Sequence, residues 1–442
     1  MLPAEGFRAR LLAGLVGAAL VKGSGLVLAF AVVATLARVL GPAEFGVYAY
    51  VLALVSLIAV PAQLGLPTLV IRETARIQQG GDWGVLKGLW RWSSGFTAGL
   101  TLLVLLACLV GVFAFSAGVP EGYVPVLLWG LGLVPLVAWG NLQGAALTGL
   151  RKVVQGQLPE NVLRPGILLI LLVAGILLWP TFEPHALEAM VLTAVAGLLS
   201  LTIALGVLRF NRPAEWGSVR PVYRQRAWFA AVWPLSMVAG MQVINRHTDI
   251  LMLGFFVSAD EVGVYRVAAQ AAALVGFSLQ IVNMVVAPHF ARLHASGETE
   301  RLQRLVTGSA RLVLLGAVPA ALVLILAGDT VLSLLFGADY ALGQTALVVL
   351  TIGQLVNAGV GSVALLLNMA GYEKETARGV LIAALINVPL NLLLIPLFGM
   401  TGAALATAIS LVIWNFILWR AVLRCLGLNS TAFRLDKASR ST

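Results

Sequence analysis

Two short stretches, LGPAEFGVYAY at residues 40–50 and VSADEVGVYRV at residues 257–267, repeat one pattern in the two halves of the chain. Glu, Gly, Val and Tyr occur at the same spacing in both, and Tyr265 follows Tyr48 by 217 residues. Each stretch lies at a turn between two long apolar runs. A repeat on this scale predicts a chain built from two equivalent halves.

A second pair of residues has the same offset. Gly122-Tyr123 corresponds to Asp339-Tyr340, again 217 residues apart. GNLQGAALTGLRK (140–152) also resembles GSVALLLNMAGYEK (361–374), with a slightly different offset. An acid near a helix N-terminus is favoured by the helix dipole in any turn, but this preference does not account for two matches at one offset.

The composition is typical of a membrane protein. Of 442 residues, 60% are hydrophobic and 11% are charged, and the mean hydropathy is +0.96. Soluble domains carry about 25% charged residues, so this chain cannot cover a water-facing surface. The apolar runs are long and continuous, which favours helices over a β-barrel. We therefore predict an all-α polytopic membrane protein.

We count twelve apolar runs that are long enough to cross a bilayer. The first follows Arg8 and Arg10 and is too long for a cleavable signal peptide, so we expect it to be retained. The predicted spans are 11–37, 45–70, 93–117, 123–148, 163–180, 186–208, 228–256, 262–290, 306–327, 343–370, 379–397 and 400–423.

The basic residues predict the orientation of these spans. With both termini in the cytoplasm, 25 of the 29 Lys and Arg residues fall in cytoplasmic segments and only Arg38 falls outside. This is the positive-inside distribution. It explains the net charge of +10 without nucleic acid as a partner. Anionic membrane lipids are the expected partners of the five arginines in 209–228.

Six spans return the chain to its starting side, so both halves enter the membrane with the same orientation. We predict two parallel six-helix lobes around a central cavity, related by an axis along the membrane normal. The lobes are residues 1–208 and 228–442, the second with a short basic tail, and residues 209–227 form a cytoplasmic linker loop.

Four ionisable side chains lie within predicted spans, where each requires a function or a partner. Insertion scales put the cost of a charge at the bilayer centre at about 2.5–3.5 kcal/mol. The four residues are Lys22 in the first span, Arg246 and Asp249 in the seventh, and Arg266 in the eighth. Because three of the four are basic, we predict a cationic cavity that binds an anionic group.

Amides near these charges can donate and accept hydrogen bonds with hydroxyl groups. The predicted substrate-binding residues are Lys22, Arg246, Arg266, Gln242, Asn245 and Gln270. Asp249 is the one acid in this set and the candidate for ion coupling. Two alternatives stay open, because Arg246 and Asp249 at i, i+3 can form a simple salt bridge and Arg266 can extend to the external interface.

Two longer segments resemble a known family. LARVLGPAEFGVYAYVLALVSLIAVPAQLGLPTLVIRETAR (36–76) is similar to the first two spans of polysaccharide flippases of the MOP (multidrug/oligosaccharidyl-lipid/polysaccharide) superfamily. ALLLNMAGYEKETARGVLIAALINVPLNLLLIPLFGMTGAALATAIS (364–410) resembles spans 10 to 12 of that family. The length, the span count and the two-lobe symmetry agree over the whole chain. The resemblance indicates the O-antigen/exopolysaccharide flippase branch.

This resemblance implies a transporter that moves undecaprenyl-pyrophosphate-linked oligosaccharide across the bacterial cytoplasmic membrane by alternating access. A lipid II flippase, a drug/cation antiporter of the same fold and, less favoured, a membrane polysaccharide polymerase are the alternatives. Polysaccharide polymerase or export proteins are expected partners. The four histidines lack metal-ligand spacing, no GxxxxGK[ST] motif occurs, and we expect no cofactor and no enzymatic activity.

The charge distribution predicts that Ser218 faces the cytoplasm. A Ser218→Cys variant, in a background without Cys108 and Cys425, should react with an impermeant maleimide only after the cells are permeabilised. A cysteine at Ala43, in a turn expected outside, is the positive control. Labelling at residue 218 in intact cells would contradict the predicted orientation.

Overall fold

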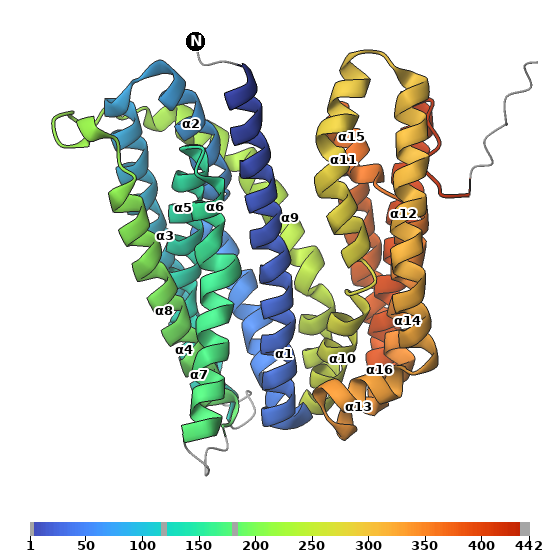
Figure 1. Ribbon diagram of the computed structural model, residues 1–442. Helices are drawn as coiled ribbons and strands as arrows, with labels where there is room; N and C mark the ends of the chain where they lie inside the picture. The colour runs from blue at the N-terminus through green and yellow to red at the C-terminus, as the bar shows by residue number, and fades with distance from the viewer. Residues whose placement is uncertain (1–3, 116–121, 179–183, 434–442) are drawn as a thin grey trace, which may run out of the picture. The chain divides into compact units, whose positions relative to one another are not determined.

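The computed structural model describes residues 4–115, 122–178 and 184–433, and within them the chain is helical and contains no strand (Figure 1). By internal contacts it divides into two units, Met1–His247 and Thr248–Thr442. The boundary falls within α9.

Unit 1 begins with a long, broken helix and contains most of the shorter connecting helices. Its elements are α1 Ala4–Gln63, α2 Leu66–Gly80, α3 Trp83–Phe115, α4 Tyr123–Leu131, α5 Leu133–Gly149, α6 Val153–Leu158, the π-helix η2 Pro159–Leu163, α7 Arg164–Leu178, α8 Ala186–Phe210, the 3₁₀ turn η3 Ala214–Trp216, and α9 Gln225–Phe256, which continues into unit 2.

Unit 2, like unit 1, consists of long, apolar helices and shorter connecting helices. Its elements are α10 Ala259–Ala272, α11 Phe277–Ala295, α12 Thr299–Leu326, α13 Gly328–Phe336, the 3₁₀ segment η4 Ala338–Gly343, α14 Gln344–Val360, α15 Val363–Met369 and α16 Glu373–Leu426. Within this unit α14 packs against α10, α12 and α16.

In the described residues nine helices are long and apolar enough to cross a membrane, or ten if α10 and α11, bent by 44°, form one span. Two of these ten are long enough to cross twice, at 44 residues (Leu20–Gln63) and 54 residues (Glu373–Leu426). At 1.5 Å per residue they reach about 66 and 81 Å, against a hydrocarbon core of about 30 Å. Counting each twice makes the ten compatible with the twelve spans predicted.

Both long helices are broken at a glycine. Gly41 has φ 73° and Gly399 has φ 55°, a region that side chains with a Cβ rarely adopt. Pro42 follows the first break and has no N–H to continue the ladder of hydrogen bonds. Each break therefore ends one span and starts the next.

The repeated stretches make the same contact in each unit. Glu44 accepts a hydrogen bond from the backbone N–H of Ala186, the first residue of α8, at 2.7 Å. Glu261 accepts one from the N–H of Met400, directly after the break at Gly399, at 3.3 Å. A carboxylate at a helix N-terminus satisfies a free N–H and complements the helix dipole.

The tyrosines of the repeat also have matching partners. Tyr48 is hydrogen-bonded to Thr193 of α8 at 3.0 Å, and Tyr265 is hydrogen-bonded to Thr407 of α16. Thr407 follows Thr193 by 214 residues, and Met400 follows Ala186 by the same interval. The sequence repeat is thus a repeat of tertiary contacts.

The loop between α8 and α9 packs against unit 1. Lys87 of α3 is buried and its Nζ donates hydrogen bonds to the carbonyls of Trp216 (2.7 Å) and Val219 (2.9 Å). The N–H of Val222 bonds to Gly84 O at 2.9 Å. A Cβ at Gly88 would lie 1.9 Å from the Val222 carbonyl oxygen, so only glycine permits this approach.

Two predicted spans start ten residues later than the helical segments that contain them, the third at 93, where α3 starts at Trp83, and the fifth. The fifth span was expected at 163–180, but the helical segment runs from Val153 to Leu178 through the π-helix. Glu160 therefore lies inside the helical segment, one turn before Arg164, rather than in the loop before it. Asp249 is consequently not the only acid within a span, and the hydropathy pattern missed this because the helix begins with polar residues.

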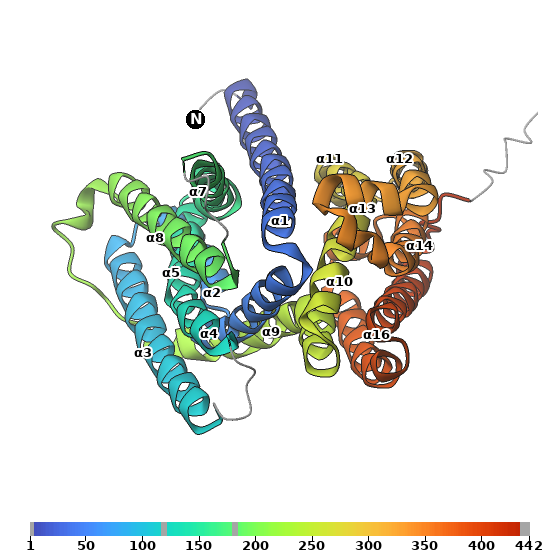
Figure 2. The same ribbon diagram turned by 90° about the horizontal axis from the view of Figure 1, so that it is seen from below.

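In unit 1, α5 packs against α1, α2, α3, α6 and α8, and the end-on view shows it enclosed by its neighbours (Figure 2). Its contact with α6 depends on two glycines. A Cβ at Gly156 would lie 2.5 Å from the Gly144 carbonyl oxygen and 2.5 Å from Thr148 Oγ1. The two helices therefore touch through backbone atoms.

This contact predicts that Gly156→Ala lowers stability. Overpacking of this kind usually costs about 1–3 kcal/mol, which exceeds the gain in helix propensity of up to about 1 kcal/mol. Thermal unfolding in detergent, followed by tryptophan fluorescence, should show a lower Tm. Gly206→Ala on α8, where a new Cβ meets open space, is the control. Equal Tm values for the two variants would refute the prediction.

Candidate functional site

Unit 1 contains a polar cavity of about 490 Å³ between α1, α2, α5, α6, η2 and α9. Such a volume lies in the range of ligand sites, which are commonly 300–1,000 Å³. The side chains that could bind a ligand through polar atoms are Ser56, Gln63, Thr68, Asn141, Thr148, Gln157, Glu160, Asn161, Arg246 and His247.

Four amides from three parts of unit 1, Gln63, Asn141, Gln157 and Asn161, belong to this polar lining. Asn141 Nδ2 donates to Gln63 Oε1 at 2.9 Å, and Gln63 Nε2 donates to its own helix at Ala59 O. Asn161 Nδ2 donates to Gln157 O at 2.9 Å. Gln157 Oε1 is buried and has no hydrogen-bond partner in the described part of the chain. The cavity therefore offers unused hydrogen-bonding capacity.

A carboxylate and two guanidinium groups give the site its charge. Glu160 forms an ion pair with Arg164 at 3.2 Å, one turn along the helix, so its charge is balanced locally. Arg246 lines the cavity from α9 and, within the described residues of unit 1, has no ion pair with a carboxylate. Because Arg164 balances Glu160, Arg246 is left as a positive charge of the lining that no carboxylate in the described part of unit 1 pairs with.

Close backbone packing shapes the walls. A Cβ at Gly140 would lie 2.2 Å from Glu160 Oε1, and a Cβ at Gly25 would lie 2.6 Å from Asn161 O. Helix α1 thus approaches the backbone of the π-helix at Gly25, and α5 approaches the Glu160 side chain at Gly140. π-Helices are rare and occur often at functional sites, and here one presents Glu160 and Asn161 to the cavity.

The structure brings only one of the predicted binding residues of unit 1 into this cavity. Arg246 lines it, together with Ala239, Val243 and His247 of the same helix. Gln242 and Asn245 are exposed and do not line the cavity, although Gln242 lies one turn before Arg246 on the same side of α9. Lys22 is exposed on α1 and is not part of the cavity lining.

The remaining predicted residues lie in unit 2. Asp249 Oδ2 accepts a hydrogen bond from the Tyr265 hydroxyl at 2.6 Å, and its Oδ1 accepts one from the N–H of Ile250. The charge of Arg266 acts on the same carboxylate. Asp249 therefore has partners other than Arg246. Gln270 is half-buried, one turn of α10 after Arg266.

The prediction from sequence missed the four amides and Glu160. A single amide within an apolar run does not indicate which other span it faces, and Glu160 precedes the apolar run of its helix. The short motifs QLG at 63–65, GNLQG at 140–144 and PEN at 159–161 contain most of these residues. Polar residues beside glycine and proline in a span were the available signal.

Known proteins with similar sequences are flippases. The chain is 25% identical over 381 residues to the probable low-salt glycan biosynthesis flippase Agl15 of Haloferax volcanii, covering 85% of this chain and 75% of that protein. It is 30% identical over 176 residues to the probable flippase AglR of the same organism, covering 39% of this chain and 37% of that protein.

Solved structures with a similar fold belong to the MOP superfamily. An inward-facing multidrug resistance MATE transporter matches with a TM-score of 0.70 at 14% identity, over 92% of this chain and 99% of that chain. The lipid II flippase MurJ in an inward closed conformation matches with a TM-score of 0.73 at 14% identity, over 92% of this chain and 87% of that chain. These similarities establish the fold.

The sequence family is established separately. A family model described as polysaccharide biosynthesis protein matches residues 35–342, a range that begins just before the first repeated stretch and ends after the second. The all-helical chain with the MOP fold therefore belongs to the polysaccharide biosynthesis protein family.

Proposed function

We propose that this protein is a flippase for a lipid-linked oligosaccharide, with undecaprenyl pyrophosphate as the lipid carrier and alternating access as the mechanism. The observation that carries the proposal is the unit 1 cavity, where four amides and Arg246 line one space in a membrane-spanning chain. The flippase relatives and the family membership support the same function.

The chemistry of the cavity fits both parts of such a headgroup. Amides donate and accept hydrogen bonds, as sugar hydroxyls do, so they can replace the water that a sugar loses in the membrane. A guanidinium binds phosphate oxygens through charge-assisted hydrogen bonds. Arg246 is suited to this role because no carboxylate of unit 1 neutralises it. Lys22, exposed on α1, and Arg266 of unit 2 are the further cations that we propose for phosphate binding.

The lipid tail requires no polar path, because it remains in hydrocarbon throughout. Only the headgroup must be shielded, since hydroxyls and phosphates without hydrogen-bond partners are costly in an apolar medium. A polar cavity in a helical transporter supplies these partners during transfer. Transfer of the headgroup through such a cavity breaks no covalent bond, which agrees with a transporter rather than a polymerase.

A cation antiporter is the second candidate, favoured by carboxylates within the helical segments, among them Glu160 and Asp249. Glu160 is neutralised by Arg164 and Asp249 is hydrogen-bonded to Tyr265, so neither presents an unpaired charge to a cationic substrate. A lipid II flippase would use the same chemistry on a different glycan. We propose the cytoplasmic membrane as the location, with both termini in the cytoplasm, and polysaccharide polymerase or export proteins as further partners.

Removal of the Arg246 guanidinium should strongly reduce transport. In proteoliposomes with a defined undecaprenyl-pyrophosphate-linked oligosaccharide, we expect Arg246→Ala to lower the translocation rate by about tenfold or more, the usual effect of losing a charged hydrogen bond. Arg226→Ala removes the same charge from an exposed position on the same helix and is the control. Equal rates for the two variants would exclude Arg246 from the substrate site.

The double variant Arg246→Ala/Asp249→Asn separates substrate binding from a simple ion pair. If Arg246 only balanced Asp249, removal of both charges would restore transport. Since Asp249 has its own partners in unit 2, we expect the double variant to remain as inactive as Arg246→Ala. Adding Lys22→Ala to Arg246→Ala should lower transport further, and normal transport by that protein would refute the cationic site.

We expect transport to proceed without ATP hydrolysis, driven by substrate supply or by an ion gradient. Purified protein in liposomes should translocate substrate with no nucleotide present. If a proton or sodium gradient accelerates transport, Asp249→Asn should abolish the acceleration, whereas the paired change Glu160→Gln/Arg164→Gln, which leaves no lone charge, should retain it. Transport that requires ATP hydrolysis would contradict the expected independence of ATP. A gradient effect that is unchanged in Asp249→Asn would exclude Asp249 as the coupling group.

A further inference from the structure

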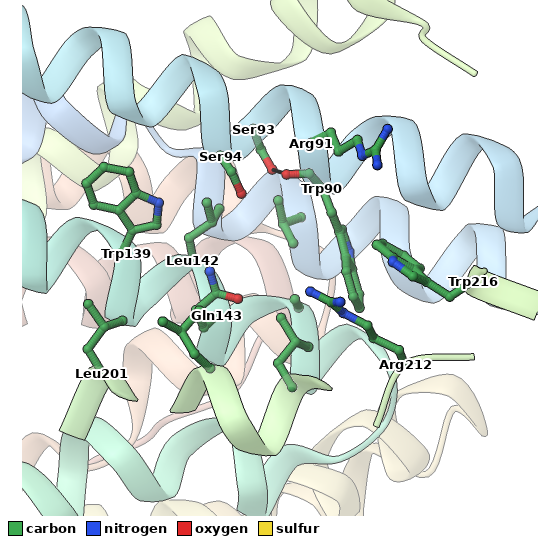
Figure 3. Close-up of a pocket in the computed structure, with 14 residues that line it drawn as sticks. Trp90, Arg91, Ser93, Ser94, Trp139, Leu142, Gln143, Leu201, Arg212 and Trp216 are labelled. Carbon is green, nitrogen blue, oxygen red and sulfur yellow. Dashed lines mark hydrogen bonds between the residues drawn. The ribbon is translucent and has the colours of Figure 1, made fainter. Parts of the chain in front are cut away.

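Unit 1 contains a second cavity, of about 540 Å³, which the proposed transport site does not use (Figure 3). It lies between α3, α5, α8 and the loop that follows α8. Its lining includes three tryptophans, two arginines, two serines and one glutamine, together with leucines of α5 and α8. The residues that matter for the following inference are Arg91, Trp139, Gln143, Leu201, Leu205, Arg212 and Trp216.

The two cavities lie on opposite faces of α5. Trp139, Gln143 and Ala146, at i, i+4 and i+7, line the second cavity. Asn141, Gly144 and Thr148 line the first. Positions separated by two residues on a helix point about 200° apart, so α5 separates the two spaces and no residue lines both.

Gln143 is the first indication of a ligand. Its side chain is only 7% exposed, and it has no hydrogen bond with any residue of the described chain. Figure 3 shows its amide among the other lining side chains of the cavity. A buried amide without a partner is costly, and a ligand with an oxygen acceptor or a hydroxyl would satisfy it.

The second indication is uncompensated positive charge. Arg91 and Arg212 line the cavity, no acid does, and neither arginine has an ion pair in the described residues. Partial burial lowers the pKa of Arg212, and the neighbouring Arg209 lowers it further. The Arg212 guanidinium lies 5.2 Å from the centre of the Trp216 ring, a cation–π contact that orients the group without neutralising it.

The third indication is an apolar wall that continues into the membrane-facing surface. Leu201 and Leu205 line the cavity on one face of α8, and Leu205 is 40% exposed. Leu198, one turn further along that face, is 52% exposed. A ligand with a charged end at Arg212 can thus extend an apolar chain along α8 toward the middle of the span.

From these three features we infer that the second cavity binds one anionic phospholipid of the surrounding bilayer. Arg212 and Arg91 hold the phosphate, the Gln143 amide donates to an ester carbonyl of the glycerol backbone, and an acyl chain lies against Leu201 and Leu205. A soluble phosphate would leave the leucine and tryptophan walls unused. A zwitterionic headgroup would bring its own cation to a cavity without an acid.

The loop that forms one wall is fixed independently of the ligand. Lys87 donates hydrogen bonds to the Trp216 and Val219 carbonyls, and its Nζ lies 5.8 Å from the centre of the Trp216 ring. Trp216 also packs against Trp90, with ring centres 5.0 Å apart. The site is therefore preformed, which lowers the entropy that binding must offset.

Native mass spectrometry of the detergent-purified protein tests the inference. With equal amounts of phosphatidylglycerol and phosphatidylcholine, we expect one phosphatidylglycerol to be retained in clear excess. Arg212→Gln should weaken retention by about tenfold, the effect of losing one charged hydrogen bond, and Gln143→Leu should weaken it less. Arg226→Gln, an equal loss of charge at an exposed position beyond the cavity, is the control and should retain the lipid. A Tm measurement for each variant verifies that it is folded.

Three results would overturn the proposal. The first is equal retention of the two phospholipids. The second is retention of phosphatidylglycerol by Arg212→Gln at the level of the parent protein. The third is displacement of the bound lipid by undecaprenyl pyrophosphate in an Arg212-dependent manner, which would assign the cavity to the transported substrate. Because the measurement is equilibrium binding, it is independent of whether the protein translocates any oligosaccharide.

Discussion

A peptide group in hydrocarbon must find its hydrogen-bond partner within the protein, and this requirement organises the whole structure. The described chain meets it with helices and with carboxylates where helices begin. Glu44 and Glu261 each satisfy a backbone N–H at a helix start. The second of these contacts lies at the break at Gly399, where the helical ladder is interrupted. Because both units use a glutamate to bind a backbone N–H at a helix start, the sequence repeats the same short pattern.

The polar side chains within unit 1 are arranged by one helix. α5 presents one amide, Asn141, and two glycines to one cavity and tryptophan and glutamine to another, while its leucines and alanines belong to the apolar core of the unit. On the first face the glycines bring α5 into close contact with the backbone of α6 and with the Glu160 side chain of η2. The charged groups also differ between the two sides of α5. On the first side the Glu160–Arg164 ion pair lies beside Arg246. On the second side Arg91 and Arg212 have no ion pair in the described residues.

Much of the fold could be predicted from the sequence. The composition indicates a membrane protein, and the spacing of the repeat indicates two equivalent halves. The all-helical class and the MOP-type fold are confirmed, as is the membership of a polysaccharide biosynthesis family, and the number of spans is compatible. The predicted start of the fifth span was wrong because polar residues open that helix. The amides at 63, 141, 157 and 161 could not be grouped, since their proximity arises from packing between helices that are distant in sequence. Pairing of Arg246 with Asp249 looked feasible from their spacing, but Tyr265, 16 residues later, binds that carboxylate instead.

The π-helix Pro159–Leu163 also has a consequence for comparing relatives of this chain. A π turn holds one residue more than an α turn, and one residue corresponds to about 100° of helix rotation. Arg164–Leu178 is therefore turned relative to a continuous helix from α6. Loss of one residue here would restore a regular helix and present a different side of α7 to its neighbours. Homologues that differ by a single residue in this segment should therefore be aligned with the gap at 159–163, and their cavity residues assigned only after that shift.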